Sequence, residues 1–431
     1  MSYKSEQGNF CLMSVGDILV SQQLAVFNEP RYLALRDLLH SGDIAFANLE
    51  TVLHRFHHWP GIAGGTFTGC DPAIVEDLKW LGLKVVSIAN NHSLDYGIPG
   101  LLETFEHLRL HRFPNAGAGM NLADAAEPIY VDTAMGRAAF IACTTTLAPG
   151  AEAIEQRSDH VGRPGVNPLR VDRRFVVDAS SLEMLAVLKS KLKIGAGELQ
   201  RRNGANDPVF TFLGQPFELG EEIGTHATVS EPDLRRNLQR IAEARQMADW
   251  VFFSCHYHEQ VVERGAPPAY IEAFAHACID AGVDVFMGHG PHSAGAIEIY
   301  KQRPIFYSLG NFVFQAETVR KQPACNYDAF GLGPDANVAE FQNNRNRAIG
   351  FQNFGEYWHS FVAKTVFRKG KLDQVEIHPV ELGFGQPRYR RGRPILADEE
   401  SAIYTLGKLQ ELSRPFNTQV ERVGCVGKVC L

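Results

Sequence analysis

Short apolar runs rich in β-branched and aromatic residues recur along the chain, alternating with amphipathic segments of helical periodicity. Two such amphipathic segments, at 71–82 and 269–282, come directly before apolar runs. Alternation of buried strands with helices is typical of α/β folds, in which helices cover the faces of a sheet. The pattern therefore predicts an α/β fold with β-sheets flanked by helices. The apolar runs lie at residues 10–15, 43–48, 84–90, 138–145, 250–256, 283–289 and 305–312.

Polar side chains stand where these apolar runs end. Asp17, Glu50 and Asn91 follow three of the runs, and His256 and His289 close two others. In open α/β sheets, ligands bind outside the carboxyl ends of the strands. Five separate segments that deliver carboxylate, amide and imidazole groups therefore predict a binding site at this edge of the sheet.

The middle and the end of the chain have a different character. Residues from about 150 to 248 are polar and broken by Gly and Pro, with helices expected at 179–203 and 231–249. We interpret this stretch as an insertion or cap over the sheet edge. The chain is loop-like beyond about 315 and then predicts two strands and a helix, at 360–367, 373–380 and 398–413. The expected domains are residues 8–380, which carry the insertion, and a C-terminal extension over 381–431.

Composition and charge restrict the class of protein. With 45% hydrophobic and 21% charged residues, the chain has the balance of a globular protein rather than a disordered one. A formal net charge of -7 argues against a nucleic-acid partner. No secretory apolar core and no stretch of about 18 apolar residues, the length of a membrane span, is visible. We therefore expect a cytoplasmic protein, and the sequence leaves its oligomeric state open.

The polar residues at the strand ends form a mixed set of oxygen and nitrogen ligands. Such a set suits Mn²⁺, Fe²⁺ or Zn²⁺ better than a thiolate site or a calcium site would. One ion takes three or four protein ligands, so this larger set indicates two ions bridged by one carboxylate. A hydrogen-bonded core position is the common alternative for any single histidine, but not for the whole set. The candidate ligands are Asp17, Glu50, Asn91, His256, His289 and His292.

Several of these motifs are specific enough to indicate a family. The chain resembles the CapA family of poly-γ-glutamate synthesis proteins, within the calcineurin-like metallophosphoesterase superfamily, over about 300 residues. The resemblance implies the sandwich fold of that superfamily, in which β-sheets are flanked by helices. Six segments carry it: SVGDILV (14–20), FANLETVL (46–53), IANNHSLDYGIPGLLETFEHL (88–108), GAGMNLADA (117–125), IDAGVDVFMGHGPHSAGAIEIY (279–300) and IFYSLGNFVF (305–314).

The resemblance implies a first metal ion held by Asp17 and His292, with Glu50 as the carboxylate that bridges two ions. Ordinary phosphoesterases place an aspartate at the bridging position. They also begin with Asp-x-His, whereas Asp17 is followed here by Ile18 and Leu19. The first ion is therefore expected to have only three protein ligands and to be weakly held or absent.

The resemblance also implies a second ion held by Asn91, His256 and His289. The family pattern His-Trp-Gly-x-Glu is HYHEQ here (256–260), so His258 replaces a glycine and adds a ligand or a general base. The usual His-His-Pro-His is His-Gly-Pro-His, so Gly290 removes one imidazole. Metal or substrate preference is therefore expected to differ from that of other family members.

His92 directly follows Asn91, the implied ligand of the second metal ion, in the sequence. His92 resembles the family's proton donor or oxyanion stabiliser. Asp95, three residues later, is a candidate for orienting the His92 ring, with a charge at a helix N-terminus as the alternative. The candidate catalytic residues are His92, Asp95 and His258.

Three residues outside the metal set are candidates for substrate binding. His57 lies in HRFHHWP (54–60), either an aromatic, basic wall of the pocket or a solvent-facing loop. Arg163, in the expected insertion, offers a planar cation to an anionic group. Asn311 follows an apolar run and either contacts the substrate or ties its loop back to the site.

The resemblance implies a metal-dependent hydrolase that acts on a γ-glutamyl or other peptide-like polyanion, or on a phosphoester, through a metal-bound hydroxide. The motifs alone do not separate an amide from a phosphoester. Two alternatives stay open: a metal-dependent peptide epimerase, and a non-catalytic partner in capsule-polymer synthesis. The expected cofactor is a pair of divalent ions of manganese, iron or zinc.

Overall fold

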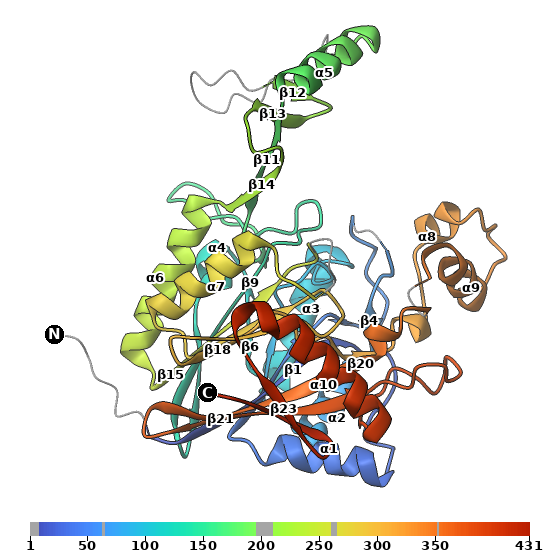
Figure 1. The fold of residues 1–431 in the computed structure, drawn as a ribbon. Helices are drawn as coiled ribbons and strands as arrows, with labels where there is room; N and C mark the ends of the chain where they lie inside the picture. The colour runs from blue at the N-terminus through green and yellow to red at the C-terminus, as the bar shows by residue number, and fades with distance from the viewer. Residues whose placement is uncertain (1–7, 63–64, 195–209, 260–264, 351–352) are drawn as a thin grey trace. The chain divides into compact units, whose positions relative to one another are not determined.

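The computed structural model describes residues 8–62, 65–194, 210–259, 265–350 and 353–431 (Figure 1). These residues fall into two compact units. The first unit takes in the chain up to Pro168 and from Arg235 to Leu431, and the second covers Leu169–Leu234. The second unit lies inside the stretch at about 150–248 that the sequence predicts as an insertion.

The larger sheet of the first unit contains ten of the described strands. They are β1 (Phe10–Leu19), β2 (Ile44–Leu49), β5 (Val85–Ser87), β6 (Asn115–Ala116), β19 (Asn311–Phe314), β20 (His359–Arg368), β21 (Lys371–Glu381), β22 (Ile395–Leu396), β23 (Val420–Val423) and β24 (Val426–Val429). The order is β23-β24-β21-β20-β1-β2-β5-β6, with β19 also paired to β1 and β22 to β21. β1 runs parallel to β2 and β19 and antiparallel to β20. The last part of the chain thus completes the sheet that begins with the first strand.

The smaller sheet of the first unit contains six of the described strands. They are β8 (Ile129–Thr133), β9 (Gly136–Thr144), β15 (Trp250–His256), β16 (Val285–His289), β17 (Ile297–Tyr300) and β18 (Arg303–Phe306). The order is β17-β18-β16-β15-β9-β8, and the four central strands run parallel to one another, whereas the edge strands β17 and β8 are antiparallel to their neighbours. Short strand pairs lie beside the two sheets: β3 (Val52–Leu53) with β4 (Gly69–Cys70), and β7 (Ala118–Gly119) with β10 (Gly165–Val166).

The two sheets pack face to face around an aromatic core. Phe46 of β2 stacks on Phe140 of β9 with ring centroids 5.3 Å apart, and Phe10 of β1 lies 5.6 Å from Phe252 of β15. These buried side chains belong to one apolar cluster drawn from both sheets. Burial of such aromatic rings supplies much of the free energy that holds two sheets together.

Helices cover the outer faces of the two sheets. The larger sheet packs against α1 and α2 through buried residues such as Leu35 and Leu78. The smaller sheet packs against α7, whose Phe274 lies 5.5 Å from Phe253. The expected sandwich of β-sheets flanked by helices is therefore confirmed (Figure 1). The helices of this unit are α1 (Pro30–His40), α2 (Ile74–Leu81), α3 (Gly97–Leu110), α4 (Leu122–Ala126), α6 (Glu231–Met247, begun in the second unit), α7 (Ala269–Ala281), α8 (Ala324–Ala329), α9 (Val338–Ile349) and α10 (Glu399–Ser413).

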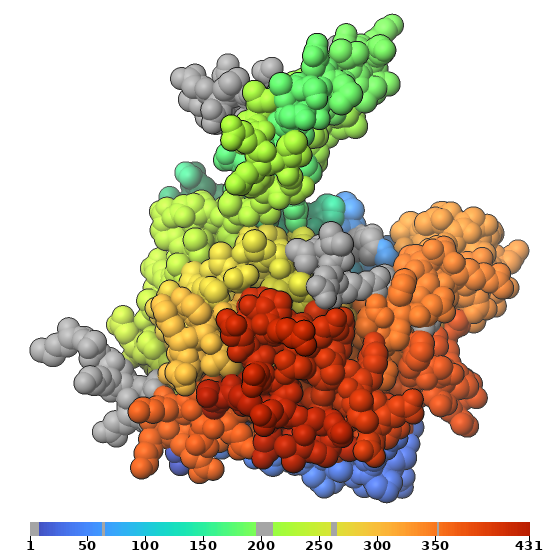
Figure 2. All heavy atoms as spheres, in the orientation of Figure 1, coloured from blue at the N-terminus to red at the C-terminus, as the bar shows by residue number. Residues whose placement is uncertain are grey.

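The C-terminal residues form part of the first unit's surface, drawn in red in Figure 2. Leu406 and Leu409 of α10 are buried in the cluster that lies between the sheets. The segment after β19, expected to be loop-like, instead contains α8 and α9. Asn337 and Glu340 form a reciprocal capping box at the start of α9, a helix signal that the sequence prediction missed.

One predicted strand, at 305–312, is divided in the structure. β18 ends at Phe306 in the smaller sheet, and β19 begins at Asn311 in the larger one. Gly310 in the connecting turn has φ of +68°, a left-handed conformation that glycine adopts without strain. The apolar run is continuous in sequence because both strands are buried, although they belong to different sheets.

The second unit is a small sheet with one helix. Its strands are β11 (Val171–Val177), β12 (Phe210–Phe212), β13 (Gln215–Leu219) and β14 (Gly224–Val229), in the order β12-β13-β11-β14. Its helix is α5 (Ala179–Lys191), which begins at the predicted position. The predicted helix extended to 203, and residues 195–203 lie outside the described part of the chain. The polar sequence of this stretch predicts no strands, so these four are a difference between prediction and structure.

A glycine in β1 brings the first strand against the turn before β19. A Cβ atom on Gly16 would overlap the carbonyl oxygen of Gly310, which accepts a hydrogen bond from Asp17 N at 2.8 Å. We expect Gly16→Ala to lower the free energy of unfolding by about 1–3 kcal/mol, because the backbone must move apart. Urea denaturation measures this change.

The matched control for that variant is Gly407→Ala in α10, where an added Cβ has no atom within 4 Å. Alanine in a helix interior is expected to raise the free energy of unfolding by about 0.5–1 kcal/mol relative to glycine. Equal effects of the two variants would contradict the close approach at Gly16.

Candidate metal centre

The two-residue period of the strands places polar side chains at one edge of the core between the sheets. Phe46 of β2 faces the smaller sheet, so Asn48 continues the same side of the strand. Phe252 of β15 faces the larger sheet, and His256 lies four residues later on that side. β16 places His289 in the same way. The polar groups therefore meet where the parallel strands of both sheets end.

Asp17 lies on β1, just after a register shift against β2, and is fully buried. Its Oδ1 accepts a hydrogen bond from Asn48 Nδ2 at 2.9 Å, and its Oδ2 accepts one from Gly290 N at 3.0 Å. The Nδ1 atoms of His289 and His292 each lie 3.4 Å from this carboxylate. Asp17 thus brings both predicted histidines of the His-Gly-Pro-His motif to one point.

Glu50 directly follows β2 and is also fully buried. Asn48 Nδ2 lies 3.2 Å from Glu50 Oε1 and 3.1 Å from His256 Nδ1, besides its hydrogen bond to Asp17. A single amide group therefore links three candidate ligands. Asn48 was not predicted as a site residue, although it stands two positions before Glu50 on the inward side of the strand.

Asn91 contacts two histidines, His256 at the end of β15 and His258 two residues later. Its Oδ1 lies 2.9 Å from His256 Nε2 and 3.2 Å from His258 Nε2. The ring centroids of the two histidines are 4.9 Å apart. His258, which replaces a glycine of the family pattern, therefore lies among the predicted ligands.

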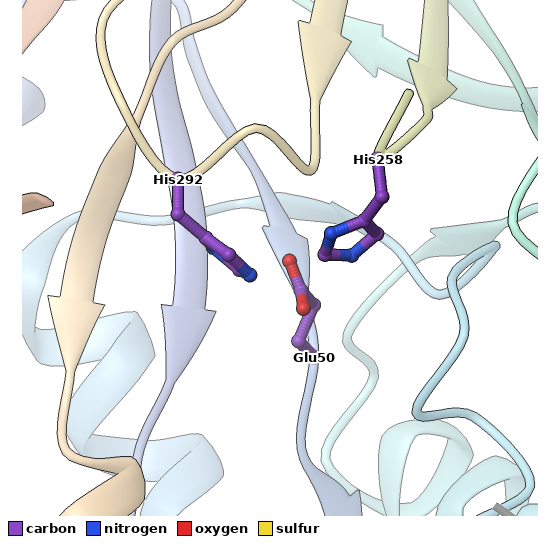
Figure 3. A group of neighbouring side chains, drawn as sticks. All are labelled: Glu50, His258 and His292. Carbon is purple, nitrogen blue, oxygen red and sulfur yellow. The ribbon is translucent and has the colours of Figure 1, made fainter. Parts of the chain in front are cut away.

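The candidate ligands form two overlapping groups. In one, single ligand atoms of Asp17, Glu50 and His256 all lie within 4.8 Å of one another. In the other, the same holds for Glu50, His258 and His292. Figure 3 shows the Glu50 carboxylate between the imidazole rings of His258 and His292. Glu50 belongs to both groups, which is the position that a carboxylate bridging two ions takes.

His92 lies beside these groups, in the turn between β5 and α3. Its Nδ1 is 2.8 Å from Asp95 Oδ2, and its Nε2 is 3.9 Å from Glu50 Oε2. Asp95 Oδ2 also accepts a hydrogen bond from Thr68 N at 2.7 Å, which fixes the carboxylate. Because Nδ1 is engaged by Asp95, the Nε2 atom of His92 is directed toward the group around Glu50.

His292 is held in an uncommon backbone conformation by Asn311. The φ angle of His292 is +59°, which non-glycine residues rarely adopt. Asn311 Oδ1 lies 2.9 Å from His292 Nδ1, and Asn311 Nδ2 donates to the carbonyl oxygens of His292 and Tyr357 at 3.0 Å each. This geometry favours the second of the two interpretations of Asn311, in which it ties its loop to the site.

Burial and neighbouring charge set the protonation of the metal-free site. Burial raises the pKa of Glu50 well above its usual value, and the charge of Asp17 adds to the effect. Burial also opposes ionisation of Asp17, but His289 and His292 outweigh it and hold the pKa of Asp17 well below its usual value. These opposed shifts make Asp17 the carboxylate that ionises first as the pH rises.

The two histidines of β15 and its extension are neutral. Burial lowers the pKa of His256 well below its usual value. Burial and the neighbouring His292 lower the pKa of His258 to about 3. A neutral imidazole keeps a lone pair, which is the form that binds a metal ion.

Unsatisfied buried atoms test whether these residues fit a metal ion. Among the described residues, Glu50 Oε2 and both ring nitrogens of His289 are buried without a hydrogen-bond partner. Buried polar atoms of folded proteins almost always have partners, and leaving one without costs about 1–3 kcal/mol. Divalent ions would satisfy these carboxylate and imidazole atoms, so the residues present fit such ions.

Two of the predicted substrate-binding residues, His57 and Arg163, contact groups outside the candidate metal centre. His57 Nε2 is 3.4 Å from Glu103 Oε2 of α3. Arg163 donates from Nε and Nη2 to the backbone oxygen of Glu152, at 3.2 and 2.8 Å. The structure brings neither residue into the groups around Glu50, and their contact with a substrate stays a prediction.

The chain is similar to several known proteins. Residues 11–316 match the family described as bacterial capsule synthesis protein PGA_cap. The uncharacterized proteins y4sH and y4uA of Sinorhizobium fredii (strain NBRC 101917 / NGR234) are each 34% identical over 433 residues, which is 97% of this chain and 93% of theirs. The capsule biosynthesis protein CapA of Bacillus anthracis is 27% identical over 240 residues, 56% of this chain and 42% of its own. The PGA biosynthesis protein CapA of Bacillus subtilis (strain 168) is 22% identical over 305 residues, 70% of this chain and 62% of its own.

None of the helices in the described part of the chain combines the length and the apolar character that crossing a lipid bilayer requires.

Proposed function

This chain belongs to the PGA_cap family of bacterial capsule synthesis proteins, and we propose that it is a metal-dependent hydrolase of an anionic, peptide-like chain. The observation that carries the proposal is the buried group of carboxylates and imidazoles around Glu50. Among the described residues, three atoms of this group have no hydrogen-bond partner. The family match spans all of these residues, since it covers 11–316.

The residues that would hold the ions come from both sheets. Divalent ions at such a site lower the pKa of water and polarise the oxygen of a scissile carbonyl or phosphoryl group. Glu50 would contact both ions, and Asn48 would orient it together with Asp17 and His256. The ligands in this proposal are Asp17, Glu50, Asn91, His256, His258, His289 and His292.

His92 would hold and move the proton that the reaction requires. Its Nδ1–H donates to Asp95, so the ring presents Nε2 toward the group around Glu50. A protonated ring there donates to the leaving group or to a developing oxyanion, and the Asp95 carboxylate stabilises the positive charge. His92 itself is nearly buried, at 8% exposed, which limits competition from bulk water.

The names of relatives support the substrate class. The relatives from Bacillus anthracis and Bacillus subtilis are named for capsule biosynthesis and PGA biosynthesis. We therefore take a γ-glutamyl chain as the first substrate to assay, with phosphoesters alongside because they present similar anionic oxygens to the same ions.

Elemental analysis of the purified full chain tests the cofactor on which this function rests. We expect about two transition-metal ions per chain at the centre around Glu50, the number that a site with one bridging carboxylate holds. The variants Asp17→Ala and His256→Ala are expected to lose them, whereas His160→Ala, on an exposed loop, retains them. Absence of metal from the wild-type chain, even after reconstitution with Mn²⁺, Fe²⁺ and Zn²⁺, would overturn the proposal.

Incubation of the metal-loaded chain with γ-glutamyl peptides in D₂O distinguishes hydrolysis from epimerisation and from binding without reaction. Cleavage without deuterium at Cα supports hydrolysis. Deuterium at Cα without cleavage would replace hydrolysis by epimerisation. Binding of the polymer by metal-free protein, with neither reaction, would identify a non-catalytic partner in polymer synthesis.

A further inference from the structure

A second group of histidines surrounds one carboxylate on α3, away from the ligands named above. Glu103 Oε2 lies 2.9 Å from His58 Nε2 and 3.4 Å from His57 Nε2. Glu103 Oε1 lies 3.4 Å from His107 Nε2, one helical turn further along α3. Ligand atoms of His57, His58 and Glu103 all lie within 4.8 Å of one another. We propose that His57, His58 and Glu103 form a separate binding site for Zn²⁺.

The donor chemistry of this group matches that ion. Two imidazoles and one carboxylate are a common ligand set for zinc, with bonds of about 2.0–2.2 Å and a tetrahedral arrangement. Donor atoms at the corners of such a tetrahedron are separated by about 3.3 Å. The 3.4 Å between His57 Nε2 and Glu103 Oε2 is close to that separation, and the 2.9 Å to His58 Nε2 is somewhat shorter.

Hydrogen bonds alone do not account for the buried carboxylate of Glu103. Glu103 Oε2 is buried and has no hydrogen bond among the described residues, although His58 Nε2 is near. The two atoms are close, but their angles do not suit a hydrogen bond. Two groups that converge without bonding to one another are expected when both point at a shared ion.

The local structure leaves the group accessible from solvent. The side chain of His57 is 58% exposed, whereas those of His58 and Glu103 are 20% and 14% exposed. An ion would therefore enter past His57, and Glu103 of α3 would hold it on the buried side. His107, beside the second oxygen of Glu103, would fix the carboxylate, as partners of metal ligands commonly do.

Zinc at this position would connect two parts of the first unit. His57 and His58 belong to the loop after β3, and Glu103 belongs to α3, which begins directly after the turn that carries His92 and Asp95. A bound ion would hold this loop against the helix. The site shares no ligand with the group around Glu50, so it stands whether or not the proposed hydrolase function is correct.

Zinc stoichiometry of the full chain tests the site. Metal-stripped protein is equilibrated with micromolar Zn²⁺, desalted and analysed for bound zinc, and a chromophoric chelator gives the affinity by competition. We expect Glu103→Gln, and the double variant His57→Ala/His58→Ala, each to bind one zinc fewer per chain than the wild type. The matched control is Glu106→Gln on the same helix, whose carboxylate pairs with Arg109 at 2.9 Å and which is expected to keep every ion.

Thermal melting with and without Zn²⁺ separates ligand loss from misfolding. The wild type and Glu106→Gln are expected to gain melting temperature on zinc addition, and Glu103→Gln to gain less. A Glu103→Gln chain that folds normally and binds as many zinc ions as the wild type, with unchanged affinity, would overturn the proposal. Loss of ions from Asp17→Ala alone concerns only the centre around Glu50 and leaves this site intact.

Discussion

Replacement of His92 by alanine is expected to slow turnover about 10²–10⁴-fold while the bound metal remains, because a positioned proton donor contributes a factor of this size. The Nε2 atom of His92 lies 3.9 Å from Glu50 Oε2, near enough to act on a group held there, while Nδ1 is committed to Asp95. Steady-state kinetics on a γ-glutamyl substrate measure the change, and elemental analysis of the same sample measures the metal.

Two further variants separate a proton-transfer role from a structural one. Asp95→Asn keeps the shape of the orienting side chain but removes its charge, and is expected to reduce turnover by about 10–100-fold. His160→Ala removes an exposed histidine whose Nδ1 lies 2.9 Å from the backbone oxygen of Val161, and is expected to change nothing. Wild-type turnover in the His92→Ala chain, with metal bound, would exclude the proposed role.

Replacement of Glu50 by glutamine is expected to weaken binding of divalent ions by more than about 100-fold. Loss of a residue that merely supports a ligand costs about 10–100-fold in affinity, and Glu50 is in direct reach of both ligand groups. The amide has the same shape but cannot carry the negative charge with which Glu50 would hold the ions. Competition with a chromophoric chelator gives the dissociation constant for the metal in the wild type and in Glu50→Gln.

Glu50→Gln is also expected to abolish the proton release that accompanies metal binding in the wild type. Burial, assisted by Asp17, raises the pKa of Glu50, so the metal-free folded chain binds a proton above the usual carboxyl range. An incoming ion displaces that proton, and affinity therefore rises with pH until the raised pKa of Glu50 is passed. Calorimetry in two buffers of different ionisation enthalpy counts the protons released.

A matched control for Glu50→Gln is Glu106→Gln, an exposed carboxylate of α3 paired with Arg109. It is expected to leave both the affinity and the proton release unchanged. Equal metal affinity in the wild type and in Glu50→Gln would show that this carboxylate does not bridge the ions.

The sequence predicts those parts of the fold in which the pattern of buried residues allows only one secondary structure and one strand direction. The apolar run at 250–256 becomes β15 with the same bounds, and the helix expected at 269–282 becomes α7, Ala269–Ala281. Because parallel strands end at a common edge, residues at the ends of separate runs, such as Asp17 and His256, are neighbours. The expected family is confirmed as well.

Other features depend on contacts that sequence spacing does not encode. The role of Asn48 arises because its amide reaches three side chains carried by β1, the end of β2 and β15. The strands of the second unit contain only half-buried and exposed residues, so the burial signal that marks a core strand is missing. The division of the run at 305–312 follows from a turn at Gly310 inside a continuously apolar segment.

The two ends of the second unit lie side by side. Val171 at the start of β11 pairs with Val229 at the end of β14, and Arg170 O accepts a hydrogen bond from Ser230 N at 2.8 Å. A segment whose entry and exit are adjacent tolerates insertion, deletion or exchange, because its points of attachment need not move. We therefore expect changes in the length of this segment to leave the strands of the first unit in place.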